Sequence, residues 1–357
     1  MVRKQQRVVV AMSGGVDSSV AAALLLQQGY EVIGLMLRLW SEPGKEDENR
    51  CCTPDSLAQA RRVAYQLDIP FYAIDAREIF HDMVVNYFLN GYACGLTPNP
   101  CLICNRQIRW GFLRQKAHEF GANYMATGHY AQISTDVHNQ FILLRSVDKG
   151  KDQSYVLYSL NQEQLAFTVL PVGGYAKSQV RKLAKYFNLP VTDRKDSQDL
   201  CFLAGDDYRN FLIRNYPQTI KPGEIVSISG DSLGWHSGLA FYTIGQRKGL
   251  NIYTNIPLYV LAKDLARNKL IVGPREALGK RQLTASSINW ISGAPPANIF
   301  QALVKIRYTA EEVLGLVSVQ SKDSLSVEFS EPLRDITPGQ AVVFYDHDVC
   351  LGGGIIQ

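Results

Sequence analysis

The segment that most constrains the fold is residues 13–19, Ser-Gly-Gly-Val-Asp-Ser-Ser. It follows a β-prone apolar run over residues 8–12 and precedes a helical pattern over residues 20–28 that stops at Gly29. A strand that leads into a Gly/Ser turn at the start of a helix forms an anion site, because backbone N–H groups point outward there and the helix dipole favours negative charge. Paired glycines let the backbone approach a phosphate closely, and serines add hydroxyl donors. The segment therefore predicts a phosphate-binding turn.

Two common phosphate loops are excluded. The pattern G-x-x-x-x-G-K-[ST] is absent, which excludes the loop of the kinase and GTPase kind. The pattern G-x-G-x-x-G does not follow the first strand, so a dinucleotide fingerprint is not supported. Residues 13–19 instead resemble the PP-loop of ATP pyrophosphatases, which cut ATP to AMP and pyrophosphate. The alternative interpretation is a Ser/Gly turn that caps an ordinary helix.

Composition places the chain among globular proteins. Its 357 residues suggest two or three domains, and no apolar run reaches the ~18 residues that a membrane span needs. The basic N-terminus leads into a strand-like run, so we expect no cleaved signal peptide. Seven cysteines, an odd number, argue against a secreted disulfide framework and favour the cytoplasm. A net charge of +4 is too small to establish nucleic-acid binding.

Strand and helix patterns alternate through the first two hundred residues. We expect strands over residues 31–40, 71–75 and 124–127, with intervening helices over 54–68, 77–93 and 105–120. Repeated β-α units predict an α/β domain with a parallel sheet and helices on both of its faces. Ligands of such sheets bind beyond the carboxyl ends of the strands. The Ser/Gly turn and residues 128–130 should share that edge.

The pattern changes after about residue 205. One helix is expected over residues 206–216, followed by short strands, including one over 239–250, that suggest a small, mostly β module. Strands at regular spacing from about residue 284 suggest a small β-barrel. We therefore expect an α/β domain over residues 1–205, a central β-rich domain over 206–282 and a C-terminal β-barrel over 283–357.

Three cysteines are candidates for chemistry. Cys101 and Cys104 form a C-x-x-C in a proline-bracketed loop, and Cys201 lies far downstream. We expect Cys104 just before a helix, where the helix dipole raises the thiolate fraction. Alone, the C-x-x-C also fits half a zinc site, a redox pair or buried structural thiols. No second cysteine or histidine pair completes a zinc site.

Taken in order, several motifs resemble one family over essentially the whole chain, the tRNA-specific 2-thiouridylases of bacteria and organelles. The matching segments are residues 11–19, Pro98-Asn99-Pro100 with Cys104-Asn105, residues 126–130, 151–155, 195–197 with Cys201-Phe202, residues 242–250, and Arg307-Tyr308. The resemblance implies a PP-loop domain, a small central β module and a C-terminal β-barrel. It implies an enzyme that replaces the C2 oxygen of the wobble uridine with sulfur in tRNAs for Lys, Glu and Gln.

The resemblance also implies ATP and Mg²⁺. ATP adenylates the uridine oxygen, which makes it a leaving group, and Mg²⁺ neutralises the departing pyrophosphate. The implied nucleotide-binding residues are Ala11, Met12, Ser13, Gly14, Gly15, Val16, Asp17, Ser18, Ser19, Leu37 and Gly128. Asp17 is also a candidate catalytic residue that helps to hold the metal. Leu37 fits a plain core residue equally well.

In the family scheme Cys201 carries a persulfide, supplied by a sulfur-donor protein, and Cys104 is the partner called its nucleophile. Cys104 attacks the S–S bond, which leaves a Cys104–Cys201 disulfide for a reductant to open. Many members have aspartate where this chain has Cys101. Cys101, Cys104 and Cys201 are therefore also candidate ligands of a [4Fe–4S] cluster that binds free sulfide. For Cys51, Cys52, Cys94 and Cys350 we expect buried or bystander thiols.

The resemblance implies tRNA contacts around the anticodon loop, where a base is extruded at least cost. The implied contact residues are Asn99, Pro100, Cys101, His129, Lys151, Asp152, Gln153, Arg307, Tyr308 and Gln340. A core histidine is an equal alternative for His129, and a solvated turn is the alternative at residues 149–153. The basic turn at residues 246–248 is a further candidate to face RNA. A monomer on tRNA is the family precedent, and no membrane is implied.

Two other functions remain open from the residues alone. An ATP-dependent amidating ligase would keep the PP-loop but leave the three cysteines without a role. An ATP-binding RNA chaperone or sensor would fit if those cysteines were structural.

Overall fold

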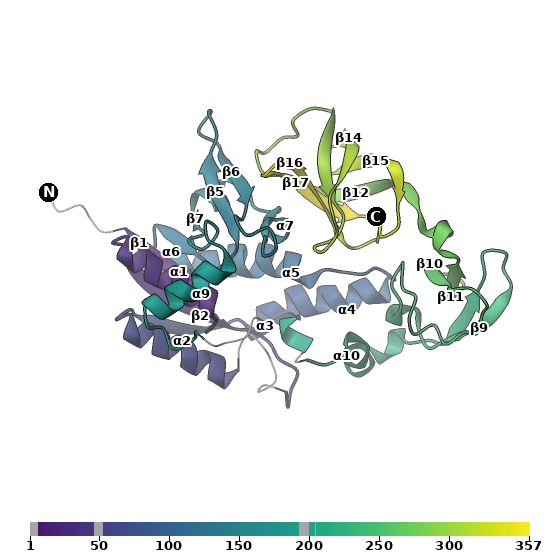
Figure 1. Cartoon of the computed structure of the whole chain (residues 1–357). Helices are drawn as coiled ribbons and strands as arrows, with labels where there is room; N and C mark the ends of the chain where they lie inside the picture. The colour runs from purple at the N-terminus through teal and green to yellow at the C-terminus, as the bar shows by residue number, and fades with distance from the viewer. Residues whose placement is uncertain (1–5, 46–52, 193–199, 204) are drawn as a thin grey trace.

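The fold was taken from a computed structural model that describes residues 6–45, 53–192, 200–203 and 205–357. Its described strands form a parallel sheet, a small central sheet and a larger sheet that includes a barrel (Figure 1). The parallel sheet has the order β3-β2-β1-β4-β7. Its strands are β1 (Arg7–Ala11), β2 (Glu31–Arg38), β3 (Phe71–Asp75), β4 (Tyr124–Ala126) and β7 (Thr168–Val169). The predicted α/β fold is confirmed.

Helices cover both faces of this sheet. Successive side chains of β1 point to opposite faces. Val8 and Val10 pack with helices α1 (Val16–Gln27), α2 (Pro54–Gln66) and α9 (Lys177–Tyr186). Val9 points to the other face, where its cluster includes Trp110 and Ala117 from the long helical segment of residues 100–119. A strand that is buried on both sides reads as a continuous apolar run, as residues 8–12 do.

Two long helical segments are interrupted by π-helical turns. One segment runs through α3 (Arg77–Phe80), η1 (His81–Val85) and α4 (Asn86–Ala93). The other runs through α5 (Pro100–Ile103), η2 (Cys104–Leu113) and α6 (Arg114–Glu119). The helix expected to begin at Asn105 thus begins at Pro100, which suits the first helical position because proline has no N–H to leave unsatisfied.

A β-hairpin, β5 (Ala131–Thr135) and β6 (Phe141–Arg145), leaves the α/β unit next to β4. Short helices α7 (Ser154–Leu157) and α8 (Gln162–Ala166) follow it. Further along the chain lie the 3₁₀ turn η3 (Cys201–Leu203), helix α10 (Tyr208–Asn215) and the turn η4 (Pro217–Thr219).

The central sheet has the order β10-β11-β8-β9. Its strands are β8 (Gly223–Val226), β9 (Ser232–His236), β10 (Tyr259–Asp264) and β11 (Lys269–Gly273), with turns η5 (Leu239–Phe241) and η6 (Arg275–Leu278). The strand expected over residues 239–250 was wrong. Gly238, Gly245 and Gly249 have positive φ angles, so this stretch is the turn η5 followed by irregular turns.

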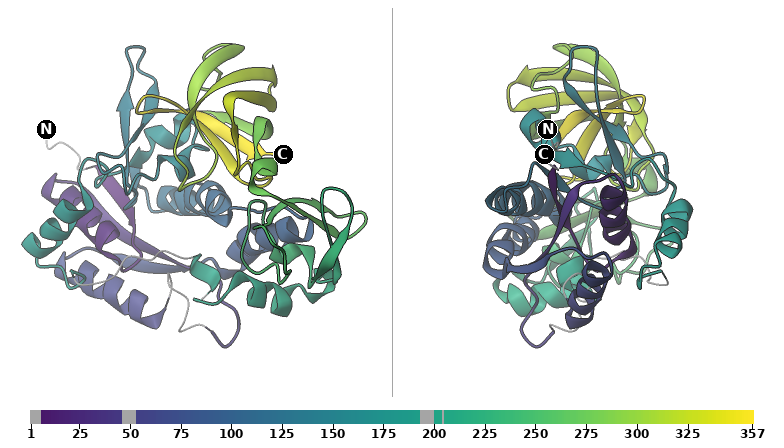
Figure 2. Two further views of the ribbon diagram at one scale, coloured as in Figure 1. Left: turned by 45° about the vertical axis from the view of Figure 1, so that its right-hand side comes forward. Right: turned by 90° about the vertical axis from the view of Figure 1, so that its left-hand side faces the viewer.

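The barrel has six strands in the order β12-β15-β14-β13-β16-β17, and pairing of β12 with β17 closes it. These are β12 (Lys280–Trp290), β13 (Ile299–Lys305), β14 (Val313–Ser321), β15 (Ser324–Leu333), β16 (Ala341–Asp346) and β17 (Val349–Ile356). The predicted barrel is confirmed. Strand β17 also pairs with β6, so the barrel and the hairpin form one continuous sheet and stand side by side (Figure 2).

Among the described residues, no helix combines the length and the apolar character that a bilayer crossing requires. The boundaries expected at residues 205/206 and 282/283 stay predictions.

Candidate active site

The predicted phosphate turn lies between β1 and α1. Gly14 has φ +71°, and a Cβ there would lie 2.3 Å from the Ser56 carbonyl oxygen in the first turn of α2, so only glycine fits. Gly15 caps α1 in an extended conformation, and the Ser19 hydroxyl donates to its carbonyl at 2.8 Å. The Ser18 hydroxyl accepts from the Ser13 N–H at 3.2 Å. The turn is thus rigid, with the N–H groups of the first helical turn at its open end.

The chain leaving β4 lies against the same helix end. A Cβ on Gly128 would be 2.7 Å from the backbone nitrogen of Ser18, so this glycine allows the two segments to touch. Strands β1 and β4 are direct neighbours, with Val10 opposite Ala126. Because β2 and β4 flank β1 on opposite sides, this is the switch point of the sheet, where parallel sheets bind ligands. The expected shared edge of the two motifs is confirmed.

Asp17 is engaged by residues from two other segments. Its carboxylate lies 2.7 and 2.8 Å from the ammonium nitrogen of Lys177, and the Tyr130 hydroxyl donates to it at 2.7 Å. Lys177 is the first residue of α9, and its side chain is only 13% exposed. Gln153 fixes Tyr130, because the Gln153 amide oxygen accepts from the Tyr130 N–H at 2.9 Å and the Gln153 N–H donates back at 2.7 Å.

Sequence reasoning missed both partners of Asp17. Tyr130 lies in a motif that the family resemblance already marks. Lys177 lies 160 residues from Asp17, and nothing in its local sequence distinguishes it.

His129 is buried beside Trp110, with 5.5 Å between ring centres. Its Nδ1 lies 2.7 Å from the Thr127 hydroxyl. Burial, with a smaller contribution from the Arg109 charge, lowers the pKa of His129 well below its usual value. The ring is therefore neutral, which favours the core-histidine alternative. Its contact with an RNA base stays a prediction.

The C-x-x-C lies inside a helix rather than before it. The Asn99 side chain caps α5 by accepting from the Cys101 N–H at 3.1 Å. Cys101 is therefore the second helical residue and is exposed, while Cys104 lies one turn further on and is half-buried. The expectation that Cys104 precedes a helix was wrong, because the Asn-Pro pair starts the helix earlier. Of the two thiols, that of Cys101 lies nearer to the N-terminus of the helix.

Cys104 and Cys201 pack against one apolar cluster. The buried part of that cluster includes Phe88 and Phe202, and Leu37, near the end of β2, also packs against it. Leu37 packs against a second cluster that contains β1 and β4 residues as well. Residues from three segments far apart in the sequence thus pack against one apolar cluster beside the carboxyl edge of the parallel sheet.

The described residues contain no group of three or more His, Cys, Asp or Glu side chains that could hold a metal ion. Cys101, Cys104 and Cys201 therefore do not form such a group. Cys350 is buried in β17, and burial raises the pKa of its thiol far above the usual value. Cys94 is exposed, and Cys51 and Cys52 lie outside the described residues.

The barrel holds the segment that precedes the C-x-x-C. The Gln340 amide donates to the Thr97 carbonyl at 2.7 Å, and the Thr97 N–H donates to the Pro338 carbonyl at 2.9 Å. Arg307 donates to the Thr337 hydroxyl and, at 3.4 Å, to the Ile244 carbonyl in the central module. Gln340 and Arg307 thus connect all three parts of the molecule.

Tyr308 is 40% exposed, and its ring centre lies 6.0 Å from that of Tyr155. Burial raises the pKa of Tyr308, and negative charge on Asp152 and Cys101 adds to the effect. Tyr308 of the barrel therefore lies within electrostatic range of the Cys101 thiol.

The three residues at 151–153 lie in different environments. Asp152 is buried and accepts from the N–H of Ser146 at 3.0 Å and from the Ser154 hydroxyl at 2.7 Å. Gln153 supports Tyr130, and Lys151 is half-buried. The side chains of Asp152 and Gln153 thus have internal partners, and a tRNA contact at these positions stays a prediction.

The fold and the turn between β1 and α1 define the class of nucleotide-binding α/β proteins with a PP-loop. Three family models match consecutive parts of the chain. The tRNA methyl transferase HUP domain family matches residues 6–205, its PRC-barrel domain matches 209–274, and an aminomethyltransferase beta-barrel domain matches 280–356.

Full-length relatives are more specific. The chain is 46% identical to "tRNA-specific 2-thiouridylase MnmA 1" of Caldanaerobacter subterraneus subsp. tengcongensis, with 98% of each chain covered. It is 47% identical to "tRNA-specific 2-thiouridylase MnmA" of Moorella thermoacetica, with 98% of this chain and 99% of the relative covered. The relative of the same name in Roseiflexus sp. strain RS-1 is 46% identical, again with 98% and 99% covered. The chain belongs to the tRNA-specific 2-thiouridylase family.

Proposed function

We propose that this protein is a tRNA-uridine 2-sulfurtransferase that uses ATP and Mg²⁺ to thiolate the wobble uridine of tRNAs for Lys, Glu and Gln. The observation that carries the proposal is the convergence described above. A phosphate-binding turn lies at the switch point of the sheet, and the apolar cluster that adjoins this edge is packed by both Cys104 and Cys201. Amidation or RNA binding alone would give these two thiols no role.

The residues present fit a nucleotide triphosphate. The first turn of α1 offers N–H donors, and the Lys177 ammonium is close enough to reach phosphates bound there. Asp17 is the carboxylate suited to Mg²⁺, which binds through one or two carboxylates and the substrate phosphates. Because Lys177 now holds both Asp17 oxygens, metal binding at Asp17 requires Lys177 to move to the phosphates.

Uracil C2 carries a poor leaving group, and ATP supplies a better one by adenylating the oxygen. Cys201 then provides sulfur as a persulfide. The Cys104 thiolate attacks the Cys201 sulfur, displaces hydrosulfide, and forms the Cys104–Cys201 disulfide. Hydrosulfide attacks C2 and AMP leaves. A thiol reductant supplies the two electrons that reopen the disulfide. We assign no [4Fe–4S] cluster, because the three cysteines form no metal-holding group among the described residues.

For the tRNA side we propose that the extruded base meets Asn99, Pro100 and Cys101 at the start of α5. Tyr308, which is partly exposed and within electrostatic range of Cys101, supplies a stacking surface. Arg307 and Gln340 bind RNA only by exchanging part of their present contacts with Ile244 and Thr97. We further propose a monomer that works in the cytoplasm and receives sulfur from a persulfide-bearing donor protein.

The test is Cys201→Ser, assayed with tRNA, ATP, Mg²⁺ and a persulfide donor. Thiolation should be lost while tRNA-dependent release of pyrophosphate continues, because the nucleotide turn is untouched. Cys94→Ser, which changes an exposed thiol on α4's end, should behave as wild type. Full thiolation by Cys201→Ser would overturn the proposed sulfur route. Pyrophosphate release that does not depend on tRNA would favour an amidating ligase.

Iron analysis separates the two sulfur chemistries. Anaerobically purified protein that lacks iron and labile sulfide should thiolate tRNA fully from a persulfide donor. Activity that follows iron content would instead support a cluster.

A further inference from the structure

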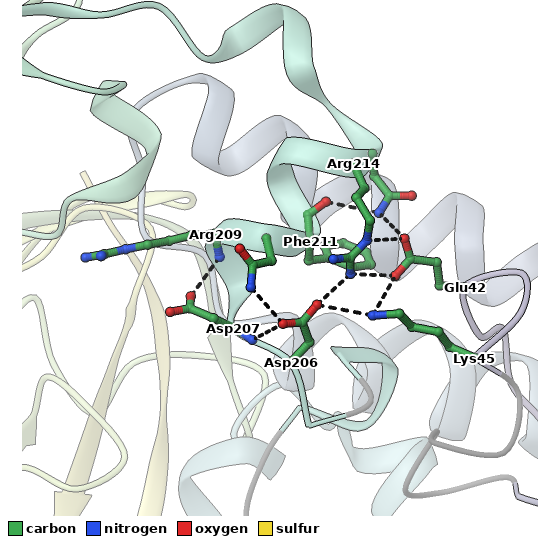
Figure 3. Close-up of polar contacts among 9 residues, drawn as sticks. Glu42, Lys45, Asp206, Asp207, Arg209, Phe211 and Arg214 are labelled. Atoms are coloured by element: carbon green, nitrogen blue, oxygen red, sulfur yellow. Dashed lines mark hydrogen bonds and ion pairs between the residues drawn. The ribbon is translucent and has the colours of Figure 1, made fainter.

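A network of charged side chains joins the chain that leaves β2 to the chain that follows η3 (Figure 3). We call it the charge clasp, and its members are Glu42, Lys45, Asp206 and Arg214. The Arg214 guanidinium holds the Glu42 carboxylate with two bonds of 2.7 and 2.8 Å. It also lies 2.8 Å from Asp206, which receives Lys45 at 3.2 Å. One arginine therefore joins carboxylates from two distant segments.

The clasp differs from ordinary surface ion pairs in its burial and geometry. The Glu42 side chain is only 12% exposed and that of Asp206 only 20%. The bond from Arg214 lowers the pKa of Glu42, and bonds from Asn210 and then Arg214 lower the pKa of Asp206. Bidentate arginine pairs impose a defined geometry, which single exposed pairs do not.

The backbone of Asp206 is hydrogen-bonded to the last residue of the turn that carries Cys201. Its N–H donates to the Leu203 carbonyl at 2.9 Å, directly after η3. Within η3, Phe202 is buried, with its ring centre 5.2 Å from Phe88 and 5.4 Å from Phe211. Cys201 is therefore followed in the chain by the buried aromatic residue Phe202 and, a few residues later, by the charged residue Asp206.

Phe202 and Asp206 both contact residues of α10, namely Phe211 and Arg214, and α10 also contacts the chain that leaves β2. Trp40 packs edge to face on Phe211 at 6.2 Å, and Glu42 binds Arg214. Helix α10 thus ties the Cys201 turn to the end of β2, where Leu37 faces the same apolar cluster.

We propose that the charge clasp is a positioning device for sulfur transfer, with Arg214 as its central residue and Glu42 and Asp206 as its anchors. It holds the Cys201 turn in reach of Cys104 and of the activated base, without itself touching the substrate. The inference rests on the proposed function, because it gives Cys201 the transferable sulfur.

The test compares Arg214→Met with Arg209→Met. Arg209 lies on the same helix but extends away from the clasp (Figure 3). Single-turnover sulfur transfer from persulfide-loaded protein should fall roughly tenfold or more in Arg214→Met, since small misplacements of reacting groups carry penalties of this size. Pyrophosphate release dependent on tRNA should stay within about twofold of wild type, because the phosphate turn is unchanged. Arg214→Lys should restore part of the transfer rate.

A second readout needs neither tRNA nor ATP. The rate at which iodoacetamide alkylates Cys201, measured by peptide mass spectrometry, should rise in Arg214→Met as the turn loosens. Cys94 serves as the internal reference. Circular dichroism checks that each variant is folded.

Unchanged sulfur transfer and unchanged Cys201 alkylation in folded Arg214→Met would overturn the positioning role. Equal loss of transfer and of pyrophosphate release would also overturn it, because that result indicates general structural damage. If wild type itself fails to transfer sulfur, the proposed function fails instead, and the alkylation result still decides whether the clasp holds Cys201.

Discussion

Lys177 is the residue that we propose to contact the nucleotide from outside the phosphate turn. We expect Lys177→Met to weaken ATP binding by roughly tenfold to a hundredfold, the range given by losing one charged hydrogen bond of about 1.5–3 kcal/mol. Lys185→Met, on the exposed face of the same helix, is the control. Titration with a fluorescent ATP analogue at fixed Mg²⁺ measures both, and equal affinities would contradict the assignment.

We expect the buried His129 to make stability depend on pH. Its pKa is lowered in the folded protein, so the unfolded chain binds the proton more readily once the pH falls below about 6.5. Stability should therefore be retained above that pH and decline toward pH 5. His129→Gln removes this titration, and its melting temperature should fall less than that of wild type between pH 7 and pH 5. An equal fall in melting temperature between pH 7 and pH 5 for the two proteins would contradict the buried neutral ring.

At the residue scale the sequence predicted the position of the Gly/Ser turn between β1 and α1, because glycine and serine have local reasons to be there. The steric need for glycine at position 14 is one such case. It did not predict that Lys177 pairs with Asp17, since that contact depends on how α9 packs against α1. Local sequence patterns do not show which residues become partners through tertiary packing.

At the scale of elements, the end of β4 and the start of α1 are in close contact beside the proposed nucleotide site. Gly128→Ala would place a methyl group 2.7 Å from the Ser18 nitrogen, so the two elements must separate. We expect loss of most ATP affinity in a protein that still folds. Gly174→Ala, whose nearest atom would be 4.0 Å away, is the matched control in the same titration. Wild-type affinity in Gly128→Ala would show that the contact tolerates expansion.

Element starts were predicted best where capping residues are explicit. Helix α2 begins at Pro54 as expected, and Thr53 caps it by accepting from the Ser56 N–H at 3.0 Å. The start of α5 was misjudged because the Asn-Pro pair was read as a loop. No sequence pattern predicted the π-helical turn that begins at Cys104, although such turns often mark functional sites.

At the scale of the whole molecule, Arg145 secures the junction between hairpin and barrel. It stacks 3.7 Å from the centre of the Tyr345 ring and pairs with Glu312 at 2.6 Å and Asp152 at 3.8 Å. Arg145→Met leaves those carboxylates without their cation, so the free energy of unfolding should fall by about 3 kcal/mol. Arg114→Met, which breaks a pair with the largely exposed Glu163, should cost less than about 1 kcal/mol. Urea titration measures both, and similar losses would contradict a special role for the junction.

Sequence patterns predicted three fold units but not the join between them. The alternating residues of β5 and β6 do not show which strand, about 200 residues further along the chain, pairs with β6. The pairing of Leu144 with Val349 arises only when the barrel is assembled.

That pairing has a practical consequence for dissecting the protein. A truncated gene that stops before residue 280 would leave β6 with an unpaired row of backbone groups next to apolar Leu143. Such a fragment should collect in inclusion bodies. Co-expressing residues 280–357 as a separate polypeptide should return it to the supernatant, as in fragment complementation.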